Sequence, residues 1–255
     1  MIELIELAKY FRNKKAVDGI TLSVPRGMLF GFLGPNGAGK TTTLKMMAGV
    51  LKPSRGRILI AGKDLSRDAE VVKRATAFIP DQPFLYEKLT AREFLNFIAD
   101  LYGLERGSSR DSEIDRLLSL FDLAAWKNDL LEGYSHGMKQ RVVLCGALLH
   151  KPSVLIVDEP MVGLDPGGAR LVKEIFRKEA AQGTTVFLST HSLEMAEDVC
   201  DEIAIIQEGK IRARGTPDYL KSIAGVDGNL EEVFLKLTKN EWDRNADLYS
   251  AETEN

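Results

Sequence analysis

The sequence GPNGAGKTTT at residues 34–43 constrains the fold of this chain more than any other segment. It follows a short apolar run at residues 28–33 and leads into a stretch with helical spacing that ends near residue 49. Its three glycines let the backbone turn tightly and bring N–H groups close to an anion, where β-carbons would obstruct them. The following helix adds unpaired amides and the positive end of its dipole. A strand, a glycine-rich loop and a helix in this order predict a loop that binds the phosphates of a nucleotide triphosphate.

Two side chains of this segment complete the template G-x-x-x-x-G-K-[ST]. Lys40 supplies a mobile cation for the β- and γ-phosphates, and the hydroxyl of Thr41 is a ligand for Mg²⁺. A plain glycine-rich turn before a helix is the alternative, which the complete template disfavours. The residues expected to contact the nucleotide are Gly34, Pro35, Asn36, Gly37, Ala38, Gly39, Lys40, Thr41 and Thr42.

Composition narrows the class of protein. Of the 255 residues 44% are apolar, which suffices for a substantial core, and the net charge of −3 gives no support for a nucleic-acid-binding surface. The two cysteines, Cys145 and Cys200, lie far apart in helix-like stretches, which indicates buried thiols in a reducing compartment rather than a disulfide framework. We expect no signal peptide at the N-terminus. The sequence also has no run of about 18 apolar residues, which is the length that would span a membrane.

The order of patterns along the chain predicts an α/β core that is interrupted by helices. Up to residue 83, strands are expected at 2–8, 17–24, 28–33, 57–61 and 76–80, with a turn at 62–64 and a helix at 67–74. Residues 84–150 read as helical, with helices at 90–102, 112–123 and 137–150 and a flexible segment at 107–112. Strands then follow at 153–158, 184–189 and 202–207, helices at 169–181 and 192–200, a small strand pair at 209–216, helices at 217–223 and 230–237, and a frayed acidic end.

A second cluster of polar residues follows the apolar run at 153–157, which is typical of a central parallel strand. Carboxylates there lie at the carboxyl end of the sheet, where open α/β sheets bind ligands. We expect Asp158 to hold Mg²⁺ and Glu159 to polarise the attacking water, the alternative being carboxylates that only cap a strand. His191 ends another apolar strand, where it either caps a turn or hydrogen-bonds to the γ-phosphate.

The start of the apolar helix at 137–150 has the features of a second anion site. Ser135 suits the N-cap position, and a plain cap is the alternative interpretation. The unpaired amides of such a helix start can bind phosphate without a lysine. One triphosphate loop and two phosphate-binding helix starts suggest that the second serves a nucleotide held by another subunit.

Together these motifs resemble those of the nucleotide-binding subunit of ABC transporters, over residues 2–237. By this resemblance, residues 34–42 form the Walker A loop. VLIVDEP corresponds to Walker B, with Asp158 as the magnesium ligand and Glu159 as the catalytic glutamate. His191 corresponds to the catalytic switch histidine. The resemblance implies that ATP and Mg²⁺ bind at these residues.

The segment SHGMKQR stands where the family has its signature, usually LSGGQ. Ser135 and Gly137, the groups closest to phosphate in family members, are retained. Tyr134, His136 and Met138 differ from the usual motif. We therefore expect a working signature that acts on the nucleotide of a second cassette, with an altered contact to ribose or phosphate from His136 and Met138.

Three further positions follow from the resemblance. The GLD tripeptide that ends at Asp165 resembles the D-loop. The Q-loop glutamine aligns with Asp81, while Gln82 stands one place later, so either residue is a candidate for the magnesium shell. An aromatic residue that stacks on adenine is expected near the first strand, where counting favours Phe11 and places Tyr10 second. Packing at a strand end is the alternative role for these two aromatic side chains.

The resemblance also implies a fold of two lobes. It is a P-loop NTPase (RecA-like) α/β core with an N-terminal antiparallel β subdomain and an inserted α-helical subdomain. The ATPase domain would span residues 1–237, with a core lobe of 1–83 and 151–215 and a helical insertion at about 84–150. Residues 216–255 would form a short helical tail.

As a function, the resemblance implies an ATP-hydrolysing subunit that drives transport through a separate multi-spanning permease and dimerises with a second cassette. The chain would be cytoplasmic and peripheral on the membrane, and the sequence after residue 80 and the tail LEEVFLKLT lean toward export-type partners. Around the expected permease groove, Phe84, Leu85, Phe94 and Phe97 are either partner contacts or ordinary core. The main rival is a soluble ABC-type ATPase in DNA repair, chromosome organisation or translation, which usually carries long coiled-coil insertions or tandem cassettes. A metabolite kinase or an inactive regulatory partner fits the motifs less well.

Overall fold

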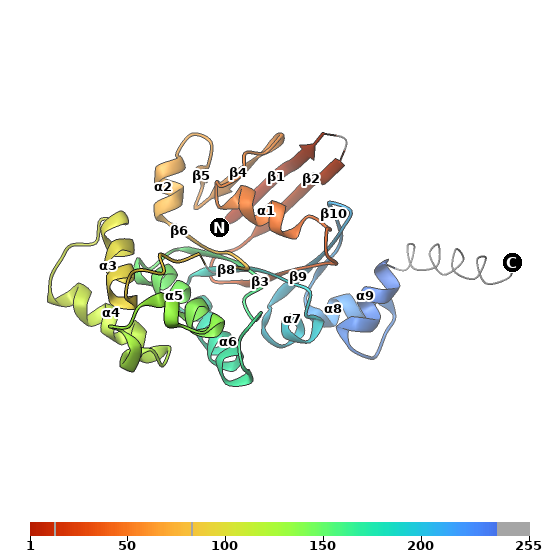
Figure 1. Ribbon diagram of the computed structural model, residues 1–255. Helices are drawn as coiled ribbons and strands as arrows, with labels where there is room; N and C mark the ends of the chain where they lie inside the picture. Colours follow the sequence, from red (N-terminus) through yellow and green to blue (C-terminus); the bar gives the residue numbers. More distant parts are fainter. Residues whose placement is uncertain (13, 83, 239–255) are drawn as a thin grey trace, which may run out of the picture.

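Two sheets organise the computed structural model, which describes residues 1–12, 14–82 and 84–238 (Figure 1). Within these residues, an antiparallel sheet has the order β2-β1-β4-β5, formed by β1 (Ile2–Phe11), β2 (Lys14–Val24), β4 (Arg55–Ile60) and β5 (Lys63–Asp64). The second sheet has the order β10-β9-β3-β8-β7-β6, formed by β3 (Leu29–Leu33), β6 (Thr76–Ile79), β7 (Val154–Asp158), β8 (Thr185–Thr190), β9 (Glu202–Gln207) and β10 (Lys210–Gly215). All neighbours in this second sheet are parallel except β9 and β10.

The helices lie in three groups around these sheets (Figure 1). Helix α1 lies between the two sheets, and α5, α6 and α7 cover the opposite face of the second sheet, while α3 and α4 lie to one side. Their bounds are α1 (Lys40–Met47), α2 (Ala69–Arg74), α3 (Ala91–Leu101), α4 (Ser108–Leu120), α5 (His136–Leu149), α6 (Pro166–Ala181), α7 (Leu193–Val199), α8 (Pro217–Ala224) and α9 (Leu230–Thr238). Short 3₁₀ helices span Ala124–Trp126 and Leu131–Gly133.

The central strands are apolar on both faces because each face packs into a different core. In β3, Phe30 and Phe32 belong to the core shared with α1 and the antiparallel sheet. Leu29 and Leu33, at the alternate positions of the same strand, belong to the core shared with the helices of the opposite face. Alternate side chains of a strand point to opposite faces, so a continuous apolar run is what a doubly covered parallel strand requires.

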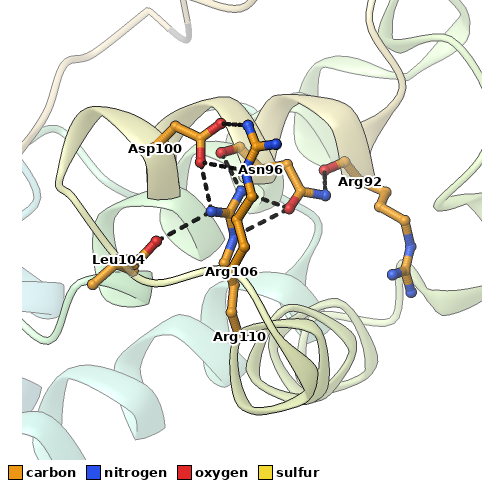
Figure 2. A network of polar contacts seen from close by, with 6 residues as sticks. All are labelled: Arg92, Asn96, Asp100, Leu104, Arg106 and Arg110. Atoms are coloured by element: carbon orange, nitrogen blue, oxygen red, sulfur yellow. Dashed lines mark hydrogen bonds and ion pairs between the residues drawn. The ribbon is translucent and has the colours of Figure 1, made fainter.

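A hydrogen-bond network holds α3 against α4 (Figure 2). The Arg110 side chain, 4% exposed, donates to Asp100 Oδ1 at 2.6 Å, to Asn96 Oδ1 at 2.7 Å and to the Leu104 carbonyl at 3.2 Å. Arg106 donates to the other oxygen of Asp100 at 2.7 Å from the surface. Figure 2 shows both guanidinium groups converging on one carboxylate, so this buried arginine has its donors well matched to acceptors.

Most sequence-based elements agree with the structure, and the α/β core with an antiparallel β subdomain and a helical part is as predicted. Three local expectations are wrong. The segment 107–112 is not flexible, because α4 begins at Ser108 and the contacts of Arg110 anchor its first turns. The segment 209–216 is not a strand pair, since it forms β10 alone, which pairs with β9. The turn at 62–64 contains the two-residue strand β5. The predicted fraying of the acidic end lies outside the described residues.

Candidate nucleotide-binding site

The glycine-rich loop lies between β3 and α1, as predicted, and close backbone approaches explain two of its glycines. A β-carbon on Gly34 would overlap the carbonyl oxygen of Ile206, and one on Gly39 would overlap that of Ala16. Gly39 also has φ +110°, where side chains are strained, and it occupies the N-cap of α1. Gly37 (φ +81°) has no atom within 4 Å of its β-carbon position, so its backbone faces open space that a ligand can approach.

A cavity of about 350 Å³ opens at this loop, and its lining combines the loop with residues from distant segments. Lys40 is 6% exposed, and its Nζ donates to the Gly34 carbonyl at 2.7 Å and lies 3.6 Å from Glu159 Oε1. The lining residues are Phe11, Lys14, Ala16, Pro35, Asn36, Gly37, Gly39, Lys40, Thr41, Thr42, Asp81 and Glu159. Of the predicted loop residues, all except Gly34 and Ala38 therefore share one cavity with the carboxylate that follows β7 and an aromatic ring from β1.

The two candidate aromatic residues differ in position. Phe11, the last residue of β1, lines the cavity, and Tyr10 does not. Both side chains are exposed, which removes core packing as their role. Lys9 Nζ lies 5.2 Å from the centre of the Phe11 ring, so an ammonium already neighbours the ring beside the phosphate loop.

Asp158 ends β7, and its carboxylate is only 1% exposed. Ser189 Oγ donates to its Oδ1, while its Oδ2 is buried without a hydrogen-bond partner among the described residues. Burial raises the pKa of this carboxyl above its ordinary value, and the nearby hydroxyl groups of Ser189 and Thr41 partly offset that effect. A buried oxygen without a donor, beside the Thr41 hydroxyl, fits a hard divalent cation such as Mg²⁺.

The Glu159 side chain lies between the Lys40 ammonium group and the His191 imidazole. Its Oε2 lies 2.9 Å from His191 Nδ1 and accepts from the His191 backbone N–H at 3.3 Å. Its own N–H donates to the Ser189 carbonyl at 3.1 Å, because β7 and β8 are parallel neighbours that end together. Glu159 has φ +49°, a left-handed conformation that costs roughly 1–3 kcal/mol in a non-glycine residue. The structure thus brings Lys40, Glu159 and His191 into one chain of contacts.

The two Q-loop candidates, Asp81 and Gln82, differ in their position relative to the cavity. Asp81 lines the cavity, and its charge contributes to the raised pKa of Asp158. Gln82 is exposed and is not among the lining residues. Of the two candidates, Asp81 rather than Gln82 therefore lies in the cavity with the phosphate loop and influences Asp158.

Ser135 is the N-cap of α5, as predicted, and accepts a hydrogen bond from Met138 N at 3.2 Å. Ser135 is exposed and does not line the cavity of its own chain. The expected contacts of His136 and Met138 with the nucleotide of a second cassette stay a prediction, and within this chain the two side chains lie differently. Met138 is half-buried and packs against the core, and the His136 ring lies against the backbone of Gly163.

The D-loop candidate Asp165 is the N-cap of α6. Its Oδ1 accepts from Gly168 N at 3.3 Å and from Arg141 Nη2 at 2.9 Å. The sequence analysis missed this arginine, and it missed Ser189 and Lys14. Ser189 is the partner of Asp158 in the register of two parallel strands, and that register is the signal that identifies it. Lys14 reaches the cavity through the β1–β2 hairpin, because it pairs with Phe11.

No helix among the residues that the structure describes is both long and apolar enough to span a membrane.

Known proteins that resemble this chain are ATP-binding proteins, as the candidate nucleotide site leads one to expect. A family model described as ABC transporter matches residues 17–162. The probable multidrug ABC transporter ATP-binding protein YbhF of Escherichia coli is 36% identical over 248 residues, which cover 96% of this chain and 42% of that protein. The daunorubicin resistance ATP-binding protein DrrA3 of Streptomyces coeruleorubidus is 39% identical over 86% of this chain and 69% of its own length. The bacitracin transport ATP-binding protein BcrA of Bacillus licheniformis is 37% identical over 87% of this chain and 71% of its own.

A solved structure of similar fold is also an ABC transporter subunit. The structure of an ATP binding subunit of an ABC transporter is 35% identical and has a TM-score of 0.88, with 93% of this chain and 99% of that chain covered. The present chain therefore spans less than half of the Escherichia coli relative but nearly the whole of this solved subunit. The match to the family model, the relatives and the shared fold together establish that the chain belongs to the family of ABC transporter ATP-binding proteins.

Proposed function

We propose that this chain binds and hydrolyses ATP to drive transport through a separate membrane permease. The observation that carries the proposal is the Glu159 carboxylate, held between Lys40 and His191 at the phosphate loop and directly after the buried Asp158. A carboxylate in that place is within reach of both a phosphate and a water molecule. This arrangement favours phosphoryl transfer to water over simple nucleotide binding.

Each residue of the site has a role in this reaction. The loop amides and the start of α1 bind the phosphate oxygens, and Lys40 balances their charge. Asp158 and Thr41 would hold Mg²⁺, which supplies Lewis-acid stabilisation of phosphoryl charge when bound. Glu159 orients the attacking water and accepts its proton, and His191 fixes the Glu159 carboxylate and can hydrogen-bond to a terminal phosphate.

A second cassette is part of the proposal. The helix start at Ser135 offers amides for an anion, yet it does not line the cavity of its own chain. Two cassettes would therefore enclose two ATP molecules, each held by the loop of one chain and Ser135 and Gly137 of the other. ATP would stabilise the dimer, and hydrolysis would release it.

An apolar groove supports a permease partner. A cavity of about 210 Å³ lies between β6, α3 and α5, and its lining is Ala77, Phe78, Pro80, Phe84, Phe94, Ile98, Tyr102, Val143, Gly146 and Ala147. Phe94 and Leu85 belong to the core, whereas Phe84 is 77% exposed and lies edge-on to Tyr86 at 6.0 Å. Exposed aromatic side chains beside an apolar groove suit an amphipathic helix of a membrane protein, which would place the chain on the cytoplasmic face.

The names of the relatives support an export function. Two of those reported above are named for daunorubicin resistance and bacitracin transport. We carry over from these names only the class of compound, so the cargo proposed for this transporter is an amphipathic antibiotic-like compound. Two of the relatives reported are named for a multidrug transporter and for bacitracin transport, which favours transport over the rival role in DNA repair, chromosome organisation or translation.

Substitution of Glu159 tests the reaction. Glu159→Gln keeps the shape of the side chain but removes the base, so we expect hydrolysis to fall by about 10²–10⁴-fold. ATP binding should persist, and the variant should accumulate as a dimer with ATP, measured by light scattering. Normal turnover in this variant would remove Glu159 from the catalytic role.

A mixing experiment tests the composite site. Ser135→Arg and Lys40→Ala should each abolish hydrolysis when alone, while Ser135→Arg still binds ATP. An equal mixture forms mixed dimers in which one of the two sites has both an intact loop and an intact helix start. Hydrolysis should therefore return on mixing. Full activity of Ser135→Arg alone would contradict the composite site.

A further inference from the structure

The start of α5 contacts the segment 162–165 of its own chain through the His136 ring. Gly163, in that segment, has φ +79°. A β-carbon built on Gly163 would lie 2.8 Å from His136 Nε2 and closer still to Cδ2. The imidazole ring therefore fills the space above the glycine, at van der Waals distance from its backbone.

Two more residues of α5 contact the same segment. A β-carbon on Gly137 would lie 3.2 Å from the Gly163 carbonyl oxygen, so the two backbones pass close to each other. One turn further along, Arg141 Nη2 donates to Asp165 Oδ1 at 2.9 Å. The Arg141 side chain is largely buried in making this contact. One face of α5 thus follows the segment from Gly163 to its end at α6.

This segment continues directly from the catalytic carboxylate. Val162 N donates to the Glu159 carbonyl at 3.3 Å, and Leu164 N donates to the Met161 carbonyl at 3.3 Å. Backbone hydrogen bonds therefore connect the Glu159 turn to the segment that the His136 ring contacts. The signature motif that this chain resembles has a glycine at the position of His136, and a glycine has no side chain for this contact.

We propose that His136 is a positioning residue that couples the Glu159 turn to the Ser135 helix start within one chain. Its ring holds the segment 162–165 against α5, so the residues that would serve the chain's own ATP and those that would serve the partner cassette's ATP move together. This inference rests on the proposed function. It assigns His136 a role inside its own chain rather than on the nucleotide of the second cassette.

A double-mutant cycle tests the coupling through hydrolysis. His136→Gly should lower kcat by about tenfold and leave the KM for ATP nearly unchanged, because the loop that binds ATP is intact. In a Gly163→Ala background, the same substitution should be neutral or beneficial, since the added methyl group needs the space of the ring. The backbone strain of Gly163→Ala cancels in the comparison. Equal effects of His136→Gly in both backgrounds would overturn the proposal.

A phenylalanine variant separates packing from contact with a nucleotide. His136→Phe keeps a ring above Gly163 but cannot hydrogen-bond to phosphate or ribose. We expect kcat within about threefold of the wild type. A rise in KM, or a loss of activity equal to that of His136→Gly, would assign the histidine to the nucleotide and overturn the proposal.

Hydrogen exchange tests the same contact without any hydrolysis. In the nucleotide-free chain, His136→Gly should speed exchange at the amides of Val162 and Leu164 by about tenfold, whereas His136→Phe should not. Unchanged exchange in His136→Gly would overturn the proposal. If the wild type hydrolyses no ATP while this exchange effect is present, the proposed function fails and the coupling stands.

Discussion

Two polar clusters in this molecule, one around the buried Arg110 and one around the buried Asp158, are built in opposite ways. Between α3 and α4, Arg110 donates to Asp100, to Asn96 and to a backbone carbonyl, and each donor has an acceptor (Figure 2). At the end of β7, Asp158 is equally buried, yet one of its carboxylate oxygens has no partner among the described residues. The next residue, Glu159, has a strained backbone. The first cluster is complete by itself, and the second is completed only by a ligand.

The pKa values of Asp100 and Asp158 are shifted in opposite directions. Hydrogen bonds from Arg106 and Arg110 lower the pKa of Asp100 to about 2. Burial raises the pKa of Asp158 instead. An ionised carboxylate is therefore stabilised by the fold at Asp100 and destabilised by it at Asp158. Satisfied groups favour the folded state, whereas an unsatisfied charge favours binding of a cation that supplies the missing interaction.

The largest expected effect comes from neutralising Asp158. Asp158→Asn removes the proposed magnesium ligand, which would be worth several kcal/mol to the reaction, so hydrolysis should fall by more than about a hundredfold. The same change removes a poorly solvated charge, so the melting temperature of the nucleotide-free chain should rise by roughly 2–4 °C, as about 1 kcal/mol would produce. Steady-state kinetics and calorimetry on one preparation check both. A lower melting temperature would break the comparison.

The satisfied cluster should respond in the reverse manner. Arg110→Met removes a buried guanidinium and leaves the half-buried Asn96 and Leu104 without this donor, so the free energy of unfolding should drop by about 2 kcal/mol. Arg106→Met is the matched control, since Arg106 is 81% exposed and water screens its ion pair, so the loss of stability should be much smaller than in Arg110→Met. Urea unfolding measures both. Equal losses would show that burial does not distinguish the two arginines.

Within the site, the uncharged ring of Phe11 should make a smaller contribution, to the affinity for ATP. Phe11→Ala removes a stacking surface for adenine and should weaken ATP binding by about 1 kcal/mol, or roughly fivefold. Tyr10→Ala serves as the control, because Tyr10 does not line the cavity. Titration with a fluorescent ATP analogue measures both dissociation constants. A larger loss in Tyr10→Ala would reverse the assignment of the two aromatics.

The smallest effect is the acid dependence of the α3–α4 cluster. Because the pKa of Asp100 is lowered from 3.8 to about 2 in the folded chain, its contribution to stability is present above pH 4 and disappears as the pH falls toward 2. Asp100→Asn lacks this contribution at every pH. Between pH 5 and pH 2, urea midpoints should therefore decline more steeply in the wild type, and parallel curves would contradict the pKa shift.

The phosphate loop and the helix starts lie in the fold where the sequence predicts them, because these features depend on local patterns. The loop lies between β3 and α1, and Thr90 and Glu93 form the predicted capping box at the start of α3. Ser135 caps α5 through its own hydroxyl. Each of these features needs only residues a few positions apart, which a sequence displays directly.

The errors share the opposite cause, dependence on distant partners. The first turn of α4 has serines and an aspartate with weak helix propensity, and tertiary contacts of Arg110 stabilise it. Strand β10 pairs with β9 rather than folding back on itself. The direction of the His136 ring depends on Gly163, 27 positions further along, since 163 − 136 = 27. Register and side-chain direction of this kind are set by packing, which no local pattern encodes.

The strand order has a consequence for the newly made chain. The antiparallel sheet is complete once residue 64 has been synthesised, but β3 pairs only with β8 and β9, among the strands described. The interval from Leu33 to Thr185 is 152 residues, since 185 − 33 = 152, which takes roughly 10–30 s at ordinary translation rates. Both edges of the apolar strand that precedes the phosphate loop therefore lack these partners until β8 has been synthesised. We expect ribosome-bound chains truncated before β8 to recruit chaperones and to fail to retain ATP.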